Sequence, residues 1–597
     1  MRIRYLVRAA EPAEHLGRFT IELGDVPTPT VDLVLPSWVP GSYHIVPYQR
    51  TVGPLTAVAR PDGTPRRVER IDKGRWRVHG EGATELTIDY DVYGHDLVTE
   101  GFDLTPDHLF LNAALCLPGV AGHADGPHDV ALEVPPAWRI VTELPRTADA
   151  PPTFRARSYD ELVDSPIDAG SMLVLTIQPH GIPHRISLCG DGGNYDAQRL
   201  TTDVGKIADA AIDLIGESPL TGYTFFYHLT DRPDGGLEHA TSNSSVVPRN
   251  CFAPEKDYKV FLGLTSHEYF HLYNVKRILP QALLPWDLSA ERYTRLLWWM
   301  EGTTDYFSDL ILRRAGLFTP KEFLENAAKL AQHFYLTPGR TRISLEDASF
   351  LAWIDYYQPY EATPNRSVSY YLKGHLVSLA LDLEIRHRSE NRASLETALR
   401  TLWTEFGKVG RPVPEDALQP ILERSSGLDL AAFFDRFVRG TDELELAAFA
   451  PYAGLVFAPK AKPKDDGAPT PGYLGARVED AGGLARFQAV YAGSPARAGG
   501  LTAGDELAAL NGNRVRYDQF EKTLGQYPPG TPVEVTVFRR GRLKQFAVTM
   551  GTPPPEAYEF TPAKDPSELA RRVYAAWVGA AWEPAKPDPT SAASPSA

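Results

Sequence analysis

The sequence predicts a multidomain α+β protein in which a β-rich N-terminal part, a mostly helical middle part and a second β-rich part follow one another. Three observations predict this order. Short segments with alternating apolar residues recur from residue 1 to about 178, helical periodicity dominates from there to 456, and alternating, glycine-punctuated segments return after 470. A chain of 597 residues is long enough for about four domains.

Residues 1–178 are predicted to form an N-terminal β-sandwich or saddle-like sheet domain. Turn residues such as Pro61-Asp62-Gly63 separate its segments. The predicted strands are Arg2–Val7, Arg18–Leu23, Val31–Leu35, Leu86–Val92, Val130–Val134 and Leu173–Gln178. The cluster Pro-Ser-Trp-Val-Pro-Gly-Ser-Tyr at 36–43 fits a rigid turn with an aromatic plug, and a place at a domain interface or cleft rim is the alternative.

Residues 179–456 are predicted to form a small β element followed by a helical body. The β element consists of strands at Tyr223–Leu229 and Leu237–Thr241, with a turn at 231–236 between them. Predicted helices cover Tyr195–Ile215, Lys259 to about Val275, Arg292–Ala315, Lys321–Phe334, Val368–Arg388, Ser394–Phe406, Pro414–Arg424 and Leu430–Val438.

The pattern His-Glu-x-x-His at 267–271 lies within the predicted helix 259–275. His267 and His271 are one turn apart on one face of such a helix. Two imidazole nitrogens at this spacing can reach one metal ion at about 2.0–2.1 Å, which indicates zinc. Glu268 lies beside the histidine line, where it can act as a general base. A surface histidine pair with an incidental glutamate is the alternative.

A catalytic zinc ion needs a third protein ligand and one open position. Glu301 is the best candidate, and Asp305 follows one turn later on the same helix face. The Asp305 carboxylate can accept the second ring N–H of a ligating histidine and fix its tautomer. Two solvated acids are the alternative. The aromatic neighbours disfavour it, because they predict a buried turn in which acids need partners: Trp298, Trp299, Tyr306 and Phe307.

Glu238 lies on a predicted strand, to whose edge an extended peptide can add backbone hydrogen bonds. A carboxylate there would pair with the ammonium group of a free N-terminus and select for it. A solvated strand glutamate is the alternative. His239 fits a residue that orients Glu238 or contacts the substrate, and it fits a plain structural histidine equally well.

Tyr371 begins its side of a predicted helix, next to Tyr370. A phenol can donate a hydrogen bond to a tetrahedral oxyanion without carrying charge. Adjacent helix residues face different ways. The choice of Tyr371 over Tyr370 therefore depends on the resemblance that follows.

Four segments in order resemble motifs of the thermolysin-like zinc peptidases and of the zinc aminopeptidases related to leukotriene A4 hydrolase. They are Gly235-Gly236-Leu237-Glu238-His239, the His-Glu-x-x-His pattern, Glu301-Gly302 and Tyr371-Leu372-Lys373-Gly374. The resemblance implies a thermolysin-like, mostly α catalytic domain and one Zn2+ per chain. It places Glu238 at the free amine of the substrate, with Gly236 and His239 as further substrate-binding candidates, and Tyr371 at the oxyanion. Leu237 and His239 depart from the Met and Asn of that clan.

These departures, together with the cluster at 36–43, the segment His271–Arg277 and a C-terminal module, resemble the glycyl aminopeptidase family of PDZ-containing zinc metallopeptidases. Gly472-Tyr473-Leu474-Gly475 resembles the carboxylate-binding loop of PDZ domains. The segments Ser494–Leu507 and Leu510–Gly512 extend that match.

A PDZ domain is therefore expected at residues 471–553. The amides of Tyr473, Leu474 and Gly475 would hold a C-terminal carboxylate, and the sheet edge would take the peptide as an added strand. A degenerate module that only packs on the catalytic domain is the alternative. Residues 457–470 are predicted to be a linker, and 554–597 a C-terminal extension with a short helix and a largely disordered tail.

The composition limits the partners and the compartment. A net charge of −15 disfavours nucleic acid as a partner. Three distant cysteines argue against a disulfide framework and against a cysteine-ligated metal, so buried free thiols are expected. No apolar stretch of signal-peptide length follows Met1, and no apolar run reaches 18 residues. The sequence thus predicts no membrane span and a cytoplasmic protein.

The favoured interpretation is a zinc aminopeptidase that hydrolyses N-terminal residues from peptides with zinc-activated water. The resemblance implies a preference for small N-terminal residues, Gly or Ala. The expected partners are peptides with a free N-terminus and a C-terminal peptide at the PDZ domain. One alternative is a zinc endopeptidase whose PDZ domain recruits substrates. The other is a non-catalytic PDZ adaptor, which the presence of every expected catalytic residue opposes.

Overall fold

The computed structural model describes residues 1–460 and 470–584. The chain divides into two compact units. The first unit comprises Met1–Thr294, Phe307–Leu317 and Leu399–Glu415, and the second comprises Arg295–Tyr306, Phe318–Ala398 and the rest from Asp416. Helices α5 (Thr303–Arg314) and α11 (Leu395–Leu402) each have residues in both units.

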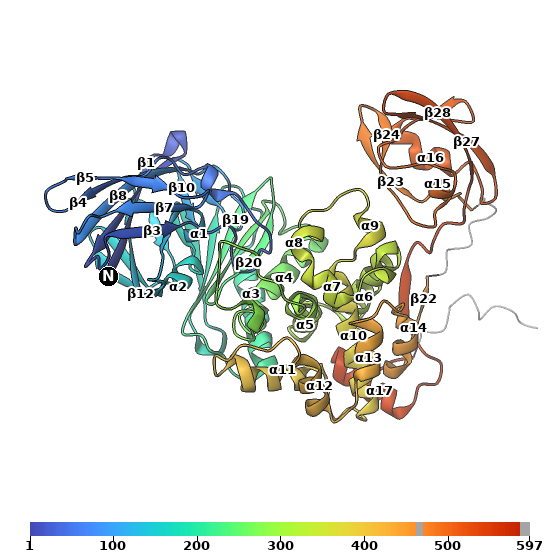
Figure 1. Ribbon diagram of the computed structural model, residues 1–597. Helices are drawn as coiled ribbons and strands as arrows, with labels where there is room; N and C mark the ends of the chain where they lie inside the picture. The colour runs from blue at the N-terminus through green and yellow to red at the C-terminus, as the bar shows by residue number, and fades with distance from the viewer. Residues whose placement is uncertain (461–469, 585–597) are drawn as a thin grey trace, which may run out of the picture. The chain divides into compact units, whose positions relative to one another are not determined.

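The first unit begins with a β-rich domain of three sheets, drawn in blue in Figure 1. Its eight-stranded sheet has the order β14 (Arg146–Asp149), β15 (Pro152–Ser158), β12 (Asp125–Glu133), β1 (Arg2–Glu11), β2 (Leu16–Gly24), β8 (Glu85–Tyr93), β4 (Thr56–Ala59) and β5 (Pro65–Arg66). One four-stranded sheet consists of β13 (Arg139–Val141), β16 (Ile167–Gly170), β10 (His108–Leu111) and β9 (Phe102–Leu104). The other consists of β11 (Gly119–Val120), β3 (Thr30–Val34), β7 (Arg75–His79) and β6 (Val68–Arg70), and the short helices α1 (Ala113–Cys116) and α2 (Tyr159–Val163) complete the domain.

A five-stranded sheet follows, in the order β17 (Met172–Ile177), β18 (His184–Cys189), β19 (Tyr223–Thr230), β21 (Ser242–Pro248) and β20 (Gly235–Glu238). Strands β18, β19 and β21 are parallel, and β20 is an antiparallel edge strand. Strand β17, which we assigned from the sequence to the N-terminal domain, is the other edge of this sheet. Its alternation is equally compatible with either sheet, and only its pairing with β18 decides between them.

Two helices accompany this sheet. Helix α3 (Ala197–Ile215) is capped by the Asp196 side chain, which accepts from Arg199 N–H, and it ends at Gly216 in the left-handed conformation. Helix α4 (Glu255–Phe270) packs against β20. The prediction that this helix reaches Val275 was wrong. The chain turns after His271, where Lys276 N–H donates to His271 O and Val275 adopts a positive φ of 102°.

The second unit contains the helical body. Its helices are α6 (Pro320–Tyr335), α7 (Leu345–Phe350), α8 (Ala352–Asp355), α9 (Thr363–Arg366), α10 (Tyr370–Arg388), α12 (Leu418–Ser426), α13 (Ala431–Phe437), α14 (Leu446–Phe449) and α17 (Glu568–Val578). The prediction of one regular helix at 292–315 was wrong at its start, because a π-helical turn at Trp298–Gly302 precedes α5. A single π turn inside a helical run often marks a functional position.

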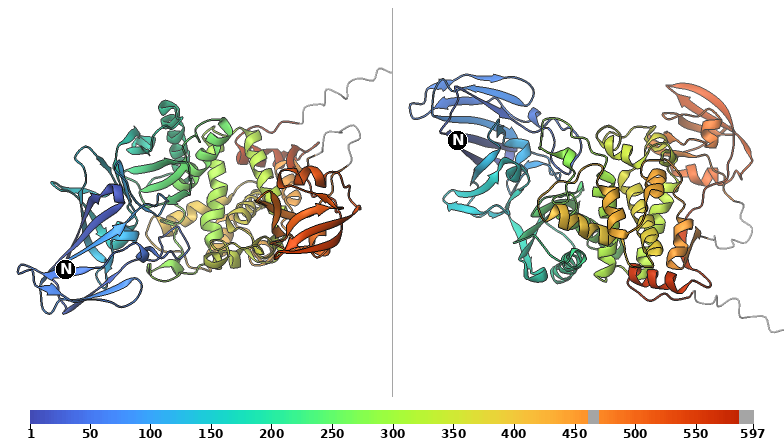
Figure 2. Two further views of the ribbon diagram at one scale, coloured as in Figure 1. Left: turned by 90° about the horizontal axis from the view of Figure 1, so that it is seen from above. Right: turned by 60° about the horizontal axis from the view of Figure 1, so that its bottom comes forward.

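Helix α17, red in Figures 1 and 2, comes near the end of the described chain but packs on the central helix α10. Trp577 Nε1 donates to Tyr306 Oη at 3.0 Å, and Tyr306 Oη donates to Asp382 Oδ2 at 2.6 Å. Arg386 pairs with the same carboxylate at 3.0 Å. This buried network makes the C-terminal helix part of the helical body.

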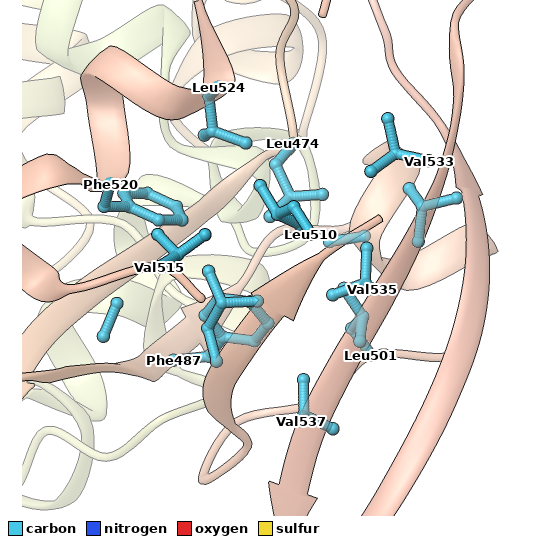
Figure 3. Packing of buried hydrophobic residues seen from close by; sticks show 14 of the residues in the cluster. Leu474, Phe487, Leu501, Leu510, Val515, Phe520, Leu524, Val533, Val535 and Val537 are labelled. Carbon is cyan, nitrogen blue, oxygen red and sulfur yellow. The ribbon is translucent and has the colours of Figure 1, made fainter. Parts of the chain in front are cut away.

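Residues 472–551 form a small β domain with strands β23 (Ala476–Ala481), β24 (Leu484–Val490), β25 (Glu506–Leu510), β26 (Asn513–Arg514), β27 (Pro532–Arg539) and β28 (Arg542–Thr549) and helices α15 (Pro495–Ala498) and α16 (Phe520–Leu524). Its own apolar core includes Leu474, Phe487, Leu510 and Val535, which Figure 3 shows packed together.

The predicted linker at 457–470 overlaps a strand. Strand β22 (Leu455–Pro459) pairs with β29 (Tyr558–Pro562), so residues 457–459 are in regular structure. Residues 461–469 and the end of the predicted tail from 585 onward lie outside the described residues. Cys116, Cys189 and Cys251 are buried and free. Among the described residues, no helix combines the length and hydropathy that a membrane span requires.

Candidate metal centre and peptide site

The first unit presents the histidine pair near the end of α4. The Nε2 atoms of His267 and His271 lie 2.8 Å apart, so both rings are directed at one point. His271 is buried, and its Nδ1–H donates to Asn274 O at 2.8 Å. That hydrogen bond leaves the lone pair on Nε2, which is the tautomer that a metal ligand needs. The turn after α4 therefore fixes the orientation of the His271 ring.

Two buried carboxylates accompany the histidines. Glu238 at the end of β20 and Glu268 on α4 are each 4% exposed. One ligand atom from each of Glu238, Glu268 and His271 lies within 4.8 Å of the others. A Cβ atom at Gly236 would lie 2.2 Å from Glu268 Oε1, so only glycine leaves room for this carboxylate. Residue 236 in the Gly-Gly-Leu-Glu-His motif is therefore a glycine, because a side chain there would collide with the Glu268 carboxylate.

The cluster at 36–43 contributes to the same place. Trp38 is fully buried and its Nε1–H donates to Asp287 O and Ala290 O at 3.0 and 2.9 Å. Gly41 has a φ of 104°, and a Cβ there would lie 2.6 Å from Glu238 Oε2. The cluster is therefore an anchored turn with an aromatic plug, and its backbone also forms a wall against Glu238.

Asp164 ties β20 to the turn after α4. Lys276 Nζ pairs with Asp164 Oδ1 at 2.6 Å, His239 Nδ1 lies 3.3 Å from the same oxygen, and Ala240 N–H donates to Oδ2 at 2.9 Å. Burial pushes the pKa of Asp164 upward, but the charges of Lys276 and His239 outweigh it and hold the pKa at about 2. Asp164, which sequence reasoning missed, follows Asp160 and Glu161 in a short acidic segment and carries no motif.

This network assigns positions to His239, Lys276 and Arg277. The ring of His239 faces Asp164, and Arg277 Nη1 donates to Ala240 O at 3.1 Å and Leu272 O at 2.7 Å. The basic pair thus braces β20 against the turn that follows α4. Lys276 and Arg277 also line a cavity of about 250 Å³ together with Gly41, Tyr43, Glu238 and Trp286.

The second unit holds Glu301 and Tyr371. Glu301 lies in the π-helical turn and is 1% exposed, and Tyr371 is half-buried at the start of α10. Burial raises the pKa of Tyr371 well above its ordinary value, and the Glu301 charge raises it further. The phenol is therefore a hydrogen-bond donor across the physiological range.

A group of tyrosines surrounds that carboxylate. The pKa values of Tyr357 and Tyr370 are also raised by burial first and by Glu301 in addition. The sequence pointed to Tyr371 by its motif. It gave no signal for Tyr357, which lies in a short irregular segment before α9.

Two glycines let α10 approach the turn that carries Glu301. A Cβ at Gly302 would lie 2.5 Å from Gly374 Cα, and a Cβ at Gly374 would lie 2.7 Å from Trp298 O. The backbones touch at this point, so a side chain at either position would push them apart. The glycines of Glu301-Gly302 and of Tyr371-Leu372-Lys373-Gly374 therefore set the distance between the carboxylate and the phenol.

The other predicted residues lie as follows. Asp305 is half-buried in α5, where its charge acts on His375 and Tyr356. Burial lowers the pKa of His375 to about 4, although Asp305 opposes this. In the small β domain Leu474 is buried in the core, while Tyr473 exchanges both backbone hydrogen bonds with Gly551. The amide of Tyr473 is therefore already engaged in this structure.

Three parts of the chain match models of known families. Residues 260–377 match the family model described as M61 glycyl aminopeptidase, and residues 4–171 match the peptidase M61 N-terminal domain. Residues 472–550 match the PDZ domain model. No match was found among curated proteins.

Solved structures provide a second comparison. The chain is similar to the crystal structure of an aminopeptidase N family protein from Idiomarina loihiensis, with 30% identity, a TM-score of 0.88 and coverage of 95% of this chain and 99% of that one. The M1 zinc metallopeptidase of Deinococcus radiodurans matches with 15% identity and a TM-score of 0.48, over 75% of this chain and 95% of that one. A mutant of that metallopeptidase bound to a Tyr-Ser-Ala substrate matches with 14% identity, a TM-score of 0.48 and the same coverage.

We expect Asp164→Asn to destabilise the protein at neutral pH. The variant's unfolding free energy should also change less between neutral and acid pH than that of wild type. A folded-state pKa of about 2, below the ordinary 3.8, contributes stability that is present above pH 4 and is lost as the pH falls through 2. The difference in unfolding free energy between wild type and variant should shrink by about 2 kcal/mol between pH 5 and pH 2. Urea unfolding across that range measures it.

The matched control is Asp160→Asn on α2, whose pKa is raised by burial and by neighbouring acids. The difference in unfolding free energy between wild type and this control should not shrink between pH 5 and pH 2. A difference between wild type and Asp164→Asn that stays constant from pH 5 to pH 2 would contradict the assigned ion pair.

Gly374→Ala should lower the melting temperature and the activity together. The added methyl group meets the backbone at Trp298 O, and overpacking of this kind costs about 1–3 kcal/mol. A melting temperature lower by about 2–8 °C is expected, with kcat reduced more than KM changes. The control is Gly263→Ala in α4, where a Cβ meets nothing within 4 Å and the melting temperature should hold or rise. Equal behaviour of the two variants would exclude the proposed packing constraint.

Proposed function

The chain belongs to the M61 glycyl aminopeptidase family and is a zinc aminopeptidase, and we propose that it releases small N-terminal residues from peptides with the residues described above. The observation that carries the proposal is the burial of Glu238 and Glu268 beside His271. One of these carboxylates has a role in binding the substrate amine and the other in moving a proton.

The proposed metal ligands are His267, His271 and Glu301, with one zinc ion per chain. The converging Nε2 atoms and the engaged Nδ1–H of His271 fit a zinc-binding pair. Support for Glu301 comes from the helical run Trp298–Arg314, in which Ser308 O accepts a hydrogen bond from Ser266, the residue before His267. Zinc at this place supplies Lewis acidity, which lowers the pKa of water and polarises a carbonyl.

The chain's own groups then have separate tasks. Glu268 removes the proton from the attacking water and passes it to the leaving amine. Tyr371 donates a hydrogen bond to the developing oxyanion, for which its raised pKa keeps the phenol protonated. Asp305 is proposed to accept the second ring N–H of a zinc-binding histidine.

The substrate end is assigned to β20. The Glu238 carboxylate would bind the free α-amine, and the edge of β20 would take the peptide backbone. Gly236 keeps the backbone clear of Glu268, and His239 acts on Glu238 through its contact with Asp164. The proposed preference for Gly or Ala is supported by the wall at Gly41, whose backbone closes against Glu238.

The PDZ domain is proposed to bind C-terminal peptides. The free edge of β23 supports this, since β23 pairs only with β24 among the described strands. Leu474 and Gly475 are the loop residues assigned to the carboxylate, while Tyr473 supports the loop through Gly551. Asn365 of the helical body exchanges hydrogen bonds with Val490 O and Ala492 N at 2.8 and 2.6 Å and holds the domain in place.

Glu268→Gln should reduce kcat for glycine para-nitroanilide by about 10²–10⁴-fold, because the general base is lost. Zinc content should stay the same as in wild type, and a chelator should abolish wild-type turnover. Glu255→Gln on the exposed start of the same helix is the control and should retain wild-type kcat. Turnover that survives complete removal of zinc would overturn the mechanism.

Glu238→Gln should lower kcat/KM for peptides with a free amine by about 10–100-fold, because a charge-assisted contact worth about 1.5–3 kcal/mol is lost. In this variant, the difference in kcat/KM between free and N-acetylated peptides should also be smaller than in wild type. Wild-type hydrolysis of acetylated peptides as fast as free ones would contradict the amine role and would favour the endopeptidase alternative.

A further inference from the structure

A second group of potential ligands lies in the first unit, away from α4. His108 on β10, Asp168 on β16 and His228 on β19 each offer one ligand atom within 4.8 Å of the others, and all three are buried. His108 Nε2 lies 2.5 Å from Asp168 Oδ1, and His228 Nε2 lies 3.4 Å from Asp168 Oδ2. Two strands of the N-terminal domain and one strand of the five-stranded sheet thus contribute one side chain each.

A thiol lies beside the group without joining it. Cys189 of β18 pairs in register with His228 of β19 and is buried. Among the described residues, the set whose ligand atoms lie within 4.8 Å of one another here consists of His108, Asp168 and His228. Two imidazoles and a carboxylate are a ligand set for zinc.

The group contains buried polar atoms that the protein leaves unsatisfied. Both ring nitrogens of His228 and Asp168 Oδ2 have no hydrogen-bond partner among the described residues, and both side chains are 1% exposed. A buried polar atom without a partner destabilises the folded protein. An imidazole nitrogen and a carboxylate oxygen that face each other at 3.4 Å without a hydrogen bond are well placed to share a cation.

The surroundings orient the rings and supply negative charge. Asp103 Oδ2 lies 3.7 Å from His108 Nδ1, which leaves Nε2 directed at Asp168. A carboxylate behind a ligating histidine is the usual arrangement at zinc sites. The Phe110 ring packs 4.6 Å from the His228 ring and closes the group from the apolar side. The buried carboxylates of Asp103 and Asp168 give the group an excess of negative charge.

We propose that His108, Asp168 and His228 bind a second divalent transition-metal ion, zinc in the first place, with a structural role. This ion would join β10 and β16 of the N-terminal domain to β19 of the five-stranded sheet. All three ligands are buried, so this second site is not placed to bind a peptide and takes no part in hydrolysis.

Zinc content of the full chain tests the proposal. After exchange into zinc chloride and removal of loose metal, wild type should hold two equivalents. The double variant His267→Gln/His271→Gln, which leaves this group untouched, should hold one. His228→Gln should also hold one, while the control His128→Gln, a buried histidine that bonds only the backbone of Gly126, should hold two.

Cobalt provides a second readout that does not depend on activity. In the His267→Gln/His271→Gln chain, Co2+ should produce a visible ligand-field band, and His108→Gln in the same background should lose that band. A double variant that holds no zinc and shows no cobalt band would overturn the proposal, even if His228→Gln fails to fold. Loss of peptidase activity in that double variant bears only on the first site, so the two proposals fail separately.

Discussion

The constraint on which the first unit depends is the burial of two carboxylates in one place. Glu238 and Glu268 lie together beside His271 and are nearly inaccessible to water. Like charges in a medium of low dielectric cannot both remain ionised without compensating positive charge. The proposed metal ion on the histidines and the ammonium group of a bound peptide would supply that charge. The arrangement is therefore stable as a binding site rather than as a closed core.

Close backbone approaches keep these charged groups in position. Gly236 makes room for Glu268, Gly41 brings the wall of the N-terminal domain against Glu238, and Gly302 meets Gly374 in the second unit. Each glycine stands where a Cβ would lie under 3 Å from a neighbouring atom. Side chains on rigid elements that touch through backbone are held more firmly than side chains on loops. Asp164 acts in the same sense, since it fixes the end of β20 through Lys276 and Ala240.

The sequence predicted what local patterns encode. The order of β-rich, helical and β-rich parts and most helices followed from periodicity, and His267, Glu268 and His271 followed from spacing on one helix. The structure differed where a residue's partners are distant in sequence. Strand β17 pairs with β18 instead of the N-terminal sheets, and Asp164 binds Lys276, 112 residues further on. The end of α4 was missed because the turn after His271 depends on backbone hydrogen bonds, which residue types do not reveal.

The same distinction separates the two proposed metal sites. His267 and His271 are four residues apart, whereas His108 and Asp168 are 60 residues apart and meet only because β10 pairs with β16. A metal held by His108, Asp168 and His228 would therefore depend on the completed fold of both sheets. Strand β19 pairs with β21, and β21 pairs with β20, which ends in Glu238. Metal binding there would stabilise the central strand of the sheet whose edge strand β20 is proposed to receive the peptide.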